Sequence, residues 1–248
     1  MLSDVSTVTN KLTWAKAYPM LETPRTVRMQ FVKVGDLQYI SHLDLQRAFY
    51  RIIKRAGIPV WYTKGFNPHA KMTFSTPLSV GTQSVCECMD LRIERDVPCD
   101  VIRDRMNAEL TDLLYINEVY IPEEKFSEIA YAEYTMHLTG AWAGEETAQR
   151  IQALLTTSPL VMTKKSKAGE KEIDIVPLIA ELSVRYDVAG GQLVLNATLS
   201  AGADSFLNPE MLIGAIRKHL GLLAANPLEE YYDIMRTSLL RQDMTRFR

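Results

Sequence analysis

Cysteine is scarce in this sequence, and long apolar runs are absent from it. The 248 residues include only three cysteines, an odd number that gives no framework of paired disulfides and fits a reducing compartment. No apolar stretch approaches the about 20 residues that a membrane-spanning helix needs. The first residues carry Asp4 and lack a basic start followed by an apolar core, so they do not resemble a secretory signal. We therefore expect a cytoplasmic protein without a membrane span.

The sequence motifs of common cofactors and metals are also missing. There is no G-x-x-x-x-G-K-[ST], no G-x-G-x-x-G after a predicted strand, no H-E-x-x-H and no nucleophile elbow. Cys86 and Cys88 share one side of a predicted strand, and Cys99 opens a helix, a spacing that matches neither a zinc ribbon nor an iron–sulfur motif. We expect these cysteines to be small buried side chains, and we predict neither a metal site nor a cofactor.

Charge is nearly balanced over the whole chain but is unevenly distributed. The net charge is −2, from 28 basic and 30 acidic residues, so overall electrostatics do not indicate a nucleic-acid partner. Between Ser41 and Gly81, however, six Lys and Arg residues accompany a single acidic residue, Asp44. This segment is therefore the part of the chain best suited to an anionic ligand.

The best-defined predicted element is a helix that begins near Ser41. Ser41 and Asp44 form a capping box, apolar residues recur at helical spacing, and Gly57 with Pro59 ends the helix. Residues 1–26 lack sustained periodicity and are predicted to be an N-terminal extension. The remaining elements of the first half are strands at 27–34, 58–63, 72–76, 84–94 and 115–121, with a second helix starting at Pro98.

The second half repeats this order. Strands are predicted in 132–140, 160–165, 178–188, 192–200 and 231–240, and helices in 145–155 and 208–221, with Gly190-Gly191 as a hairpin turn. Each half thus has the β-α-β-β-α-β order of a ferredoxin-like module. We predict an α+β protein with antiparallel sheets, in which residues 27–124 form module 1 and residues 125–248 form module 2.

Two basic loops occupy equivalent positions in the two halves. They are TKGFNPHAK at 63–71 and TKKSKAGEK at 163–171. Backbone amides around a glycine can bind an anion, and neighbouring lysines add charge, but lysine and glycine are also common in solvated hairpin tips. For the second loop we favour a hairpin tip. For the first loop we favour binding, because an aromatic residue stands among polar turn residues. The candidate residues of this first loop are Lys64, Gly65, Phe66, Asn67 and Lys71.

Histidines and arginines near this loop provide further candidates. His42 lies in the first turn of its predicted helix, where the positive helix end favours the neutral ring that a base or ligand needs. The alternative is a partly buried histidine that bonds to backbone. His69 becomes a catalytic candidate only if the loop brings it to His42. Arg47, Arg51 and Arg55 recur on the solvated side of the helix, and Trp61 follows it, so phosphate contacts and base stacking are predicted for these four residues.

Several segments together resemble a bacterial family. These segments are SHLDL at 41–45, Arg55-Ala56-Gly57 with Pro59, GFNPH at 65–69, PLSVG at 77–81, IDIVPLI at 173–179 and NPEMLIGAI at 208–216. The chain is similar over about residues 27–240 to the radical-SAM-associated family, a domain of unknown function found beside or fused to cobalamin-binding radical SAM proteins. The resemblance implies a radical SAM protein as partner and a role in RNA or ribosome biology. The chain itself lacks C-x-x-x-C-x-x-C, so it cannot hold the radical SAM cluster in the usual way.

Three functions are compatible with these observations. The first is a non-catalytic module that binds RNA or presents a substrate to the radical SAM enzyme. The second is a metal-independent RNA endonuclease with His42 as base and Lys64 or Lys71 stabilising the developing charge. The third is a scaffold that binds the radical SAM enzyme through a protein interface. We rank the first highest, because no complete acid–base pair is evident in the sequence.

Overall fold

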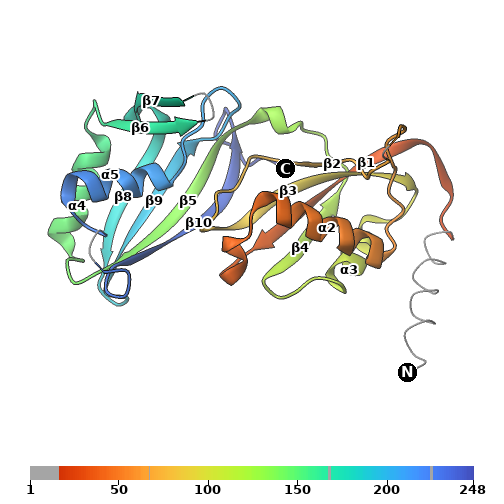
Figure 1. The fold of residues 1–248 in the computed structure, drawn as a ribbon, viewed down its shortest axis with the longest axis horizontal. Coiled ribbons are helices and arrows are strands. Elements are labelled where there is room, and N and C mark those ends of the chain that lie inside the picture. The colour runs from red at the N-terminus through yellow and green to blue at the C-terminus, as the bar shows by residue number, and fades with distance from the viewer. Residues whose placement is uncertain (1–16, 67, 167–168, 224–225) are drawn as a thin grey trace. The chain divides into compact units, whose positions relative to one another are not determined.

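The structure is a computed structural model that describes residues 17–66, 68–166, 169–223 and 226–248 (Figure 1). The chain divides into two compact units. The first unit extends to Val80 and also contains Ser84–Lys125 and Arg248, and the second contains Gly81–Gln83 and Phe126–Phe247. In the part of the chain that is described, no helix is long and apolar enough to cross a membrane.

In its described residues, the first unit has two α-helices, one 3-10 helix and four antiparallel strands. Its elements are β1 (Met20–Lys33), the 3-10 helix η1 (Gly35–Tyr39), α2 (His42–Ala56), β2 (Met72–Phe74), β3 (Thr82–Arg95), α3 (Cys99–Asn107) and β4 (Leu114–Tyr120). The strands lie in the order β4-β1-β3-β2, and Met29 of β1 faces Val119 of β4 on one side and Met89 of β3 on the other.

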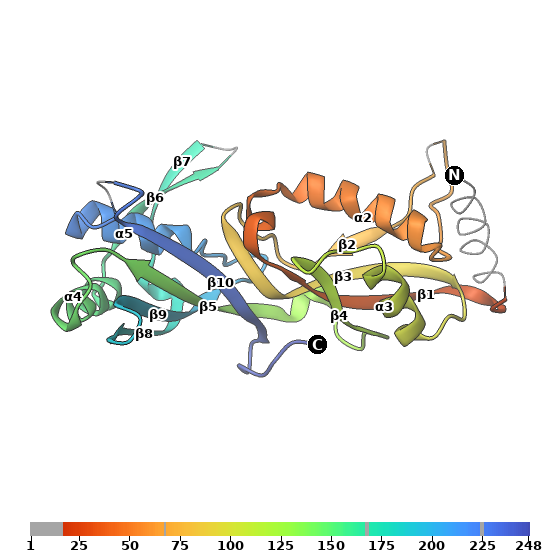
Figure 2. The same cartoon turned by 90° about the horizontal axis from the view of Figure 1, so that it is seen from below.

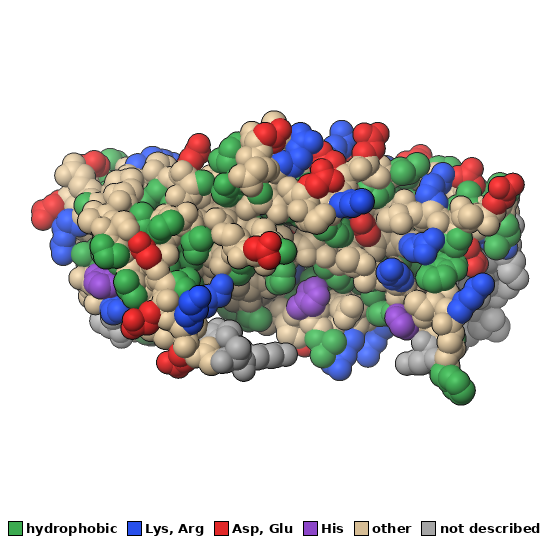
Figure 3. Space-filling model, turned by 90° about the horizontal axis from the view of Figure 1, so that it is seen from above, with side chains coloured by type: hydrophobic (Ala, Val, Ile, Leu, Met, Phe, Trp, Pro, Cys, Tyr) green, Lys and Arg blue, Asp and Glu red, His purple; other side chains and the backbone are tan. Residues whose placement is uncertain are grey.

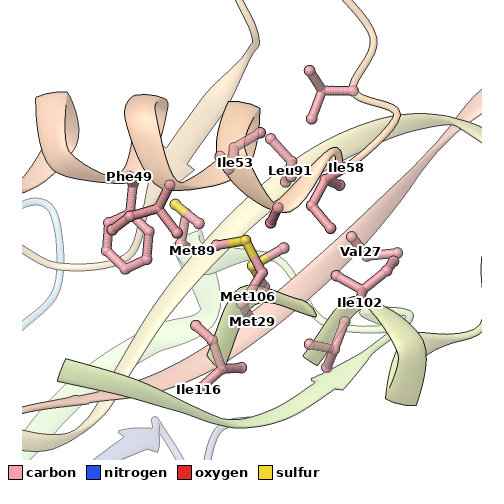
Figure 4. Close-up of a cluster of buried hydrophobic side chains, with 14 of the residues drawn as sticks. Val27, Met29, Phe49, Ile53, Ile58, Met89, Leu91, Ile102, Met106 and Ile116 are labelled. Carbon is pink, nitrogen blue, oxygen red and sulfur yellow. The ribbon is translucent and has the colours of Figure 1, made fainter. Parts of the chain in front are cut away.

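Both helices of this unit pack on the same face of its strands. Phe49 and Ile53 of α2 and Ile102 and Met106 of α3 meet apolar side chains of β1, β3 and β4 in one buried cluster (Figure 4). This packing holds α2 in place. The segment that carries the basic loop begins at the C-terminal end of α2, so its starting position is defined as well.

The ends of α2 are formed as the sequence predicts. The Ser41 hydroxyl accepts a hydrogen bond from the Asp44 amide at 3.1 Å and donates one to the Asp44 carboxylate at 2.7 Å. Gly57 closes the helix with a φ of 69°, a left-handed conformation that glycine adopts without a steric cost. The predicted N-cap at Ser41 and the stop at Gly57 are confirmed, whereas the Asp44 carboxylate accepts from the Ser41 hydroxyl and not from a backbone amide as the capping box predicts.

The second unit repeats this arrangement and adds a hairpin. Its elements are η2 (Phe126–Glu128), β5 (Ile129–Thr139), α4 (Glu145–Thr156), β6 (Val161–Ser166), β7 (Gly169–Asp174), η3 (Val176–Leu178), β8 (Ile179–Asp187), β9 (Gln192–Ser200), α5 (Glu210–Leu220) and β10 (Tyr231–Arg241). Four antiparallel strands lie in the order β10-β5-β9-β8, while β6 and β7 pair only with each other. The predicted Gly190-Gly191 turn joins β8 to β9, and Gly221 ends α5.

The α+β class with a mostly antiparallel arrangement is confirmed. Each unit has the predicted β-α-β-β-α-β order, which is the order of a ferredoxin-like module, and the second unit inserts β6–β7 after its first helix. In the second half the polar segment predicted as a loop is largely strand, since Gly169–Asp174 pairs with β6.

Two predictions about the first half are wrong in detail. The strand predicted at 58–63 is absent, because Val60 and Tyr62 form only isolated bridges, to Ile93 and Ala70. The chain separates from β3 after this single residue pair with it and then enters the basic loop. β1 begins at Met20, inside the predicted extension, although Pro24 and a bulge between Met20 and Arg25 interrupt the alternation by which a strand is recognised.

Candidate nucleic-acid interface

The base of the first basic loop is fixed to α2 and to itself. The Tyr50 hydroxyl of α2 donates a hydrogen bond to the carbonyl oxygen of Ala70 at 2.6 Å. The Thr63 amide donates to the His69 carbonyl oxygen at 2.9 Å, and the His69 amide donates to the Thr63 hydroxyl at 3.1 Å. Since Ala70 is buried as well, the loop leaves the core from a defined position.

The tip of the loop presents an aromatic ring to solvent. The side chain of Phe66 is fully exposed, and Lys64 before it and Lys71 after it in the sequence are exposed as well. Gly65 has a φ of 149°, a conformation that other residues rarely adopt, so this glycine sets the direction of the chain into Phe66. Asn67 lies outside the described residues. An apolar ring exposed to water on a loop that also carries exposed cations is suited to stacking on a ligand.

The two histidines are not brought together. His42 is the first residue of α2, and its ring and the Phe74 ring are nearly perpendicular, with a centroid distance of 4.9 Å. Tyr50, which holds Ala70, lies eight residues further on, about 12 Å along the helix axis. The loop that carries His69 turns back beyond the C-terminal end of α2 (Figures 1 and 2). In this structure His42 and His69 therefore do not form an acid–base pair.

The three predicted arginines differ in their surroundings. Arg47 forms an exposed ion pair with Asp44 at 3.2 Å, a kind of pair that contributes little and exchanges easily. Arg55 contacts both the carboxylate and the carbonyl oxygen of Glu109, each at 3.0 Å, and so links α2 to the segment after α3. Arg51 is exposed and forms no ion pair within the described ranges. Arg47 and Arg51 remain available to a ligand, whereas Arg55 has a structural role.

One basic residue of the interface was not among the predicted site residues. Lys54 is exposed and lies one helical turn after Tyr50, on the side of α2 that contacts the loop. The i, i+4 spacing to Tyr50 is present in the sequence, but only the Tyr50–Ala70 hydrogen bond shows which side of the helix faces the loop. Tyr62, at the start of the loop, is also exposed.

Trp61 is less suited to stacking than predicted. It is partly buried, and the Arg92 guanidinium lies 4.7 Å from its ring centroid. This cation covers one face of the indole, so Phe66 is the better candidate for contact with a base.

Basic side chains do not gather into one large patch on the face drawn in Figure 3, where acidic side chains are interspersed with them. Long-range attraction of a polyanion by this face is therefore weak, and binding depends on the local arrangement at the loop. The second basic loop lies largely within the strands of the β6–β7 hairpin, in which Lys164 of β6 faces Lys171 of β7. Lys164 also donates a hydrogen bond to the Phe206 carbonyl oxygen at 3.2 Å.

The cysteines are placed as small side chains in or near the core. Cys86 and Cys88 are buried on β3, and Cys99 is partly buried at the start of α3. Burial raises the pKa of the Cys88 thiol to about 12, an effect to which Glu87 adds and which Arg28 opposes. A thiol with this pKa is a poor nucleophile at neutral pH. Within the described ranges no three His, Cys, Asp or Glu side chains are grouped so that they could hold a metal ion.

The raised pKa of Cys88 predicts a loss of stability in alkaline solution. In the unfolded chain this thiol ionises near its ordinary pKa of about 8.5. Its contribution to folding is therefore complete below that pH and is lost as the pH rises towards about 12. Urea unfolding at a series of pH values is expected to show a smaller alkaline decline for Cys88→Ala than for the wild type. If the stability of both proteins declines equally with rising pH, other groups account for the pH dependence.

Together these features define an α+β protein with a basic loop that carries an exposed aromatic ring. The chain belongs to a family of uncharacterized proteins conserved in bacteria (DUF2344), whose sequence pattern matches residues 26–209. No curated protein matches the chain.

Several solved structures resemble parts of the chain at low identity. A chain of a Cbf5-Nop10-Gar1 complex matches 86% of this chain at 11% identity, with a TM-score of 0.45. The match covers 48% of that chain, so this protein spans about half its length. An unknown protein from Galdieria sulphuraria matches 86% of this chain and 99% of its own length at 10% identity, with a TM-score of 0.25. DyPB from Rhodococcus jostii RHA1 matches 88% of this chain and 94% of its own length at 9% identity, with a TM-score of 0.20. These TM-scores are too low to indicate a shared function.

Proposed function

We propose that this protein is a non-catalytic module that binds single-stranded RNA through the loop at residues 62–71 and the adjoining side of α2. The observation that carries the proposal is the fully exposed ring of Phe66, flanked in the sequence by the exposed Lys64 and Lys71, on a loop whose base is fixed. Exposed aromatic rings that stack on bases, next to cations that contact the backbone, are the common means of binding single strands without sequence preference.

The number of exposed cations predicts how strongly RNA binding depends on salt. Five exposed basic side chains of α2 and the loop are available to phosphates, namely Arg47, Arg51, Lys54, Lys64 and Lys71. If all five engage, the logarithm of the affinity falls with the logarithm of the salt concentration at a slope of roughly −3.5.

We further propose that the bound RNA, or a substrate attached to it, is presented to a radical SAM enzyme. This step rests on the resemblance of SHLDL, GFNPH, PLSVG and the related segments to the radical-SAM-associated family. In such a pair the partner supplies the redox chemistry, and this chain supplies binding and orientation.

The binding function is better supported than the endonuclease function. A metal-independent nuclease needs a base and an acid within reach of one phosphate. His42 contacts the Phe74 ring at the N-terminal end of α2, whereas His69 pairs with Thr63 at the base of the loop, next to the Ala70 carbonyl that Tyr50 holds. His42→Ala is accordingly expected to leave a bound RNA as intact as the wild type does.

Phe66→Ala is expected to weaken binding of a short single-stranded RNA by about 5-fold to 150-fold at low salt, because base–aromatic stacking contributes about 1–3 kcal/mol per base. Fluorescence anisotropy of labelled RNA measures the affinity. Leu228→Ala is the matched control, since Leu228 is an exposed apolar residue of the second unit, and it is expected to bind RNA like the wild type.

The double variant Lys64→Gln/Lys71→Gln tests the cations separately. It is expected to reduce the magnitude of the salt slope by roughly 1.4, corresponding to two lost phosphate contacts. The proposal fails if the wild type does not bind RNA at low salt, if its salt slope is near zero, or if Phe66→Ala binds as tightly as the wild type. If RNA does not bind but loop variants lose a co-purified radical SAM protein, the loop is a protein interface.

A further inference from the structure

The outer edge of β8 carries the side chain of a glutamine. In the described part of the chain β8 pairs with β9 only, so its other edge is the end of the sheet (Figure 1). Gln152 of α4 reaches this edge. Its Oε1 atom accepts a hydrogen bond from the Val184 amide at 2.9 Å, and its Nε2 atom donates one to the Leu182 carbonyl oxygen at 3.4 Å. The side-chain amide thus takes the place of a peptide group in a neighbouring strand.

These two hydrogen bonds show which backbone groups of β8 point away from β9. Backbone groups of successive residues point to opposite sides of a strand, so Leu182, Val184 and Tyr186 direct theirs to the outer edge. An outer edge with such groups is a template for pairing with another extended chain. The contact with Gln152 shows that this edge accepts an amide as its ligand, and one side chain covers only the middle of it.

The charged residues of β8 make the strand complementary to a second copy of itself. Glu181 and Arg185 lie on the same side of the strand, both are exposed, and neither forms an ion pair within the described ranges. When two copies pair in the antiparallel direction with Ser183 opposite Ser183, Glu181 of each copy lies directly opposite Arg185 of the other. Opposite charges in these positions stabilise a pair of strands.

The backbone groups select the same register. It places Leu182 opposite Val184 of the second copy, so the outward groups of the two edges meet and exchange hydrogen bonds. A shift by one residue sets outward groups against inward ones. A shift by two residues places Glu181 opposite Ser183 in one direction and opposite Asp187 in the other, where like charges repel. One register therefore satisfies both the hydrogen bonds and the charges.

We propose that two copies of this protein pair through β8, in the register that places Glu181 opposite Arg185, and that Gln152 competes with the second copy for the edge. Because Gln152 leaves the edge before the second copy binds, pairing of the wild type is weak and reversible. The interface belongs to the second unit, so it does not depend on the RNA function proposed for the basic loop of the first unit.

The first test measures the oligomeric state of the full chain by sedimentation velocity over a series of protein concentrations. Gln152→Ala is expected to dimerise at least about tenfold more tightly than the wild type, because each copy no longer gives up two hydrogen bonds on pairing. Gln46→Ala makes the same substitution on α2 of the first unit. It is the matched control and is expected to behave like the wild type.

Charge variants in the Gln152→Ala background test the register. Glu181→Arg and Arg185→Glu each set like charges opposite each other, and each alone is expected to weaken dimerisation about tenfold. A mixture of the two is expected to form a heterodimer, because every facing pair is then of opposite charge. If Gln152→Ala folds poorly by circular dichroism, the same charge variants are compared in the wild-type background at high protein concentration.

Three results overturn the proposal. The first is that the parent of the charge variants stays monomeric at the highest concentration at which it is soluble. The second is that either single charge variant dimerises as tightly as its parent, which would place the contact elsewhere on the molecule. The third is that the mixture of Glu181→Arg and Arg185→Glu does not associate, which would exclude the antiparallel register.

Discussion

Replacement of Arg28 by methionine is expected to lower the free energy of unfolding by about 3–5 kcal/mol. The Arg28 side chain is only 1% exposed, and its Nε and Nη2 atoms donate to the two carboxylate oxygens of Asp90 at 2.7 and 2.9 Å. The substitution leaves the Asp90 carboxylate, which is 19% exposed, without this bidentate partner. An uncompensated charge in such a site costs far more than the pair itself contributes.

The pairing of Arg28 with Asp90 follows from the strand register. The two residues lie directly opposite each other on β1 and β3. Burial disfavours the charged guanidinium, but the hydrogen bond and the charge of Asp90 outweigh that effect, so the pKa of Arg28 is raised. Arg28 therefore stays charged at every pH at which the protein is studied, and the prediction does not depend on pH through this residue.

Two further variants test this explanation by urea unfolding. Arg28→Met/Asp90→Leu replaces both charges by apolar groups and is expected to be clearly more stable than Arg28→Met alone. Arg47→Met breaks the exposed ion pair with Asp44 and is expected to change the free energy of unfolding by no more than about 1 kcal/mol. If the double variant is as unstable as Arg28→Met, the loss does not come from the unpaired carboxylate.

The burial of Arg28 is a feature of β1 that the sequence pattern does not predict. The alternation of Val27, Met29 and Phe31 predicts the core side of this strand, and these residues are buried as expected. The same alternation places Arg28 on the opposite side, where solvent exposure is the usual expectation, yet Arg28 is buried. Periodicity identifies which side a residue faces. It contains no information about what covers that side, because the covering groups, such as Asp90, come from distant parts of the sequence.

The ends of the helices were predicted well because the residues that determine them lie close together in the sequence. Ser41 with Asp44, and Gly57 after Ala56, act within a few residues of the chain, and the structure confirms both ends of α2. The strand predicted at 58–63 failed because a strand needs a partner in register. Here Val60 finds a partner for one residue pair only.

The candidate site was predicted in part, for the same reason. The exposed cations of the loop and the aromatic ring at its tip follow from composition and turn signals. Whether an arginine pairs with another residue of the protein depends on tertiary contacts. Arg55, for example, pairs with Glu109, a residue far away in the sequence. The separation of His42 from His69 likewise depends on the path of the loop past the end of α2. Such contacts cannot be inferred from spacing.

Phe49→Ala is expected to lower the free energy of unfolding by about 3–5 kcal/mol, the usual cost of removing a fully buried phenylalanine. Phe49 of α2 has no exposed surface, and its ring lies 5.1 Å from the Phe31 ring and 5.9 Å from the Phe74 ring, between centroids. The substitution opens a cavity between α2 and the strands that the remaining rings cannot fill without leaving their own contacts. Because typical domains are stable by about 5–15 kcal/mol, this loss is a large fraction of the total.

Urea unfolding followed by circular dichroism measures the effect of Phe49→Ala. Leu43→Ala is the matched control, because Leu43 lies on the same helix and is exposed, and it is expected to change the free energy of unfolding by no more than about 0.5 kcal/mol. A loss below about 1 kcal/mol for Phe49→Ala would contradict the packing described for the first unit.

Phe49 and Phe66 belong to the same unit and are expected to give opposite results in two measurements. Phe49→Ala reduces stability but leaves RNA affinity unchanged under conditions in which the variant is folded, because the Tyr50–Ala70 hydrogen bond still holds the loop. Phe66→Ala reduces RNA affinity but changes the free energy of unfolding by no more than about 0.5 kcal/mol, because its ring contacts solvent rather than core. If Phe66→Ala instead destabilises the fold by more than about 1 kcal/mol, the ring packs against the protein and is not available to a base.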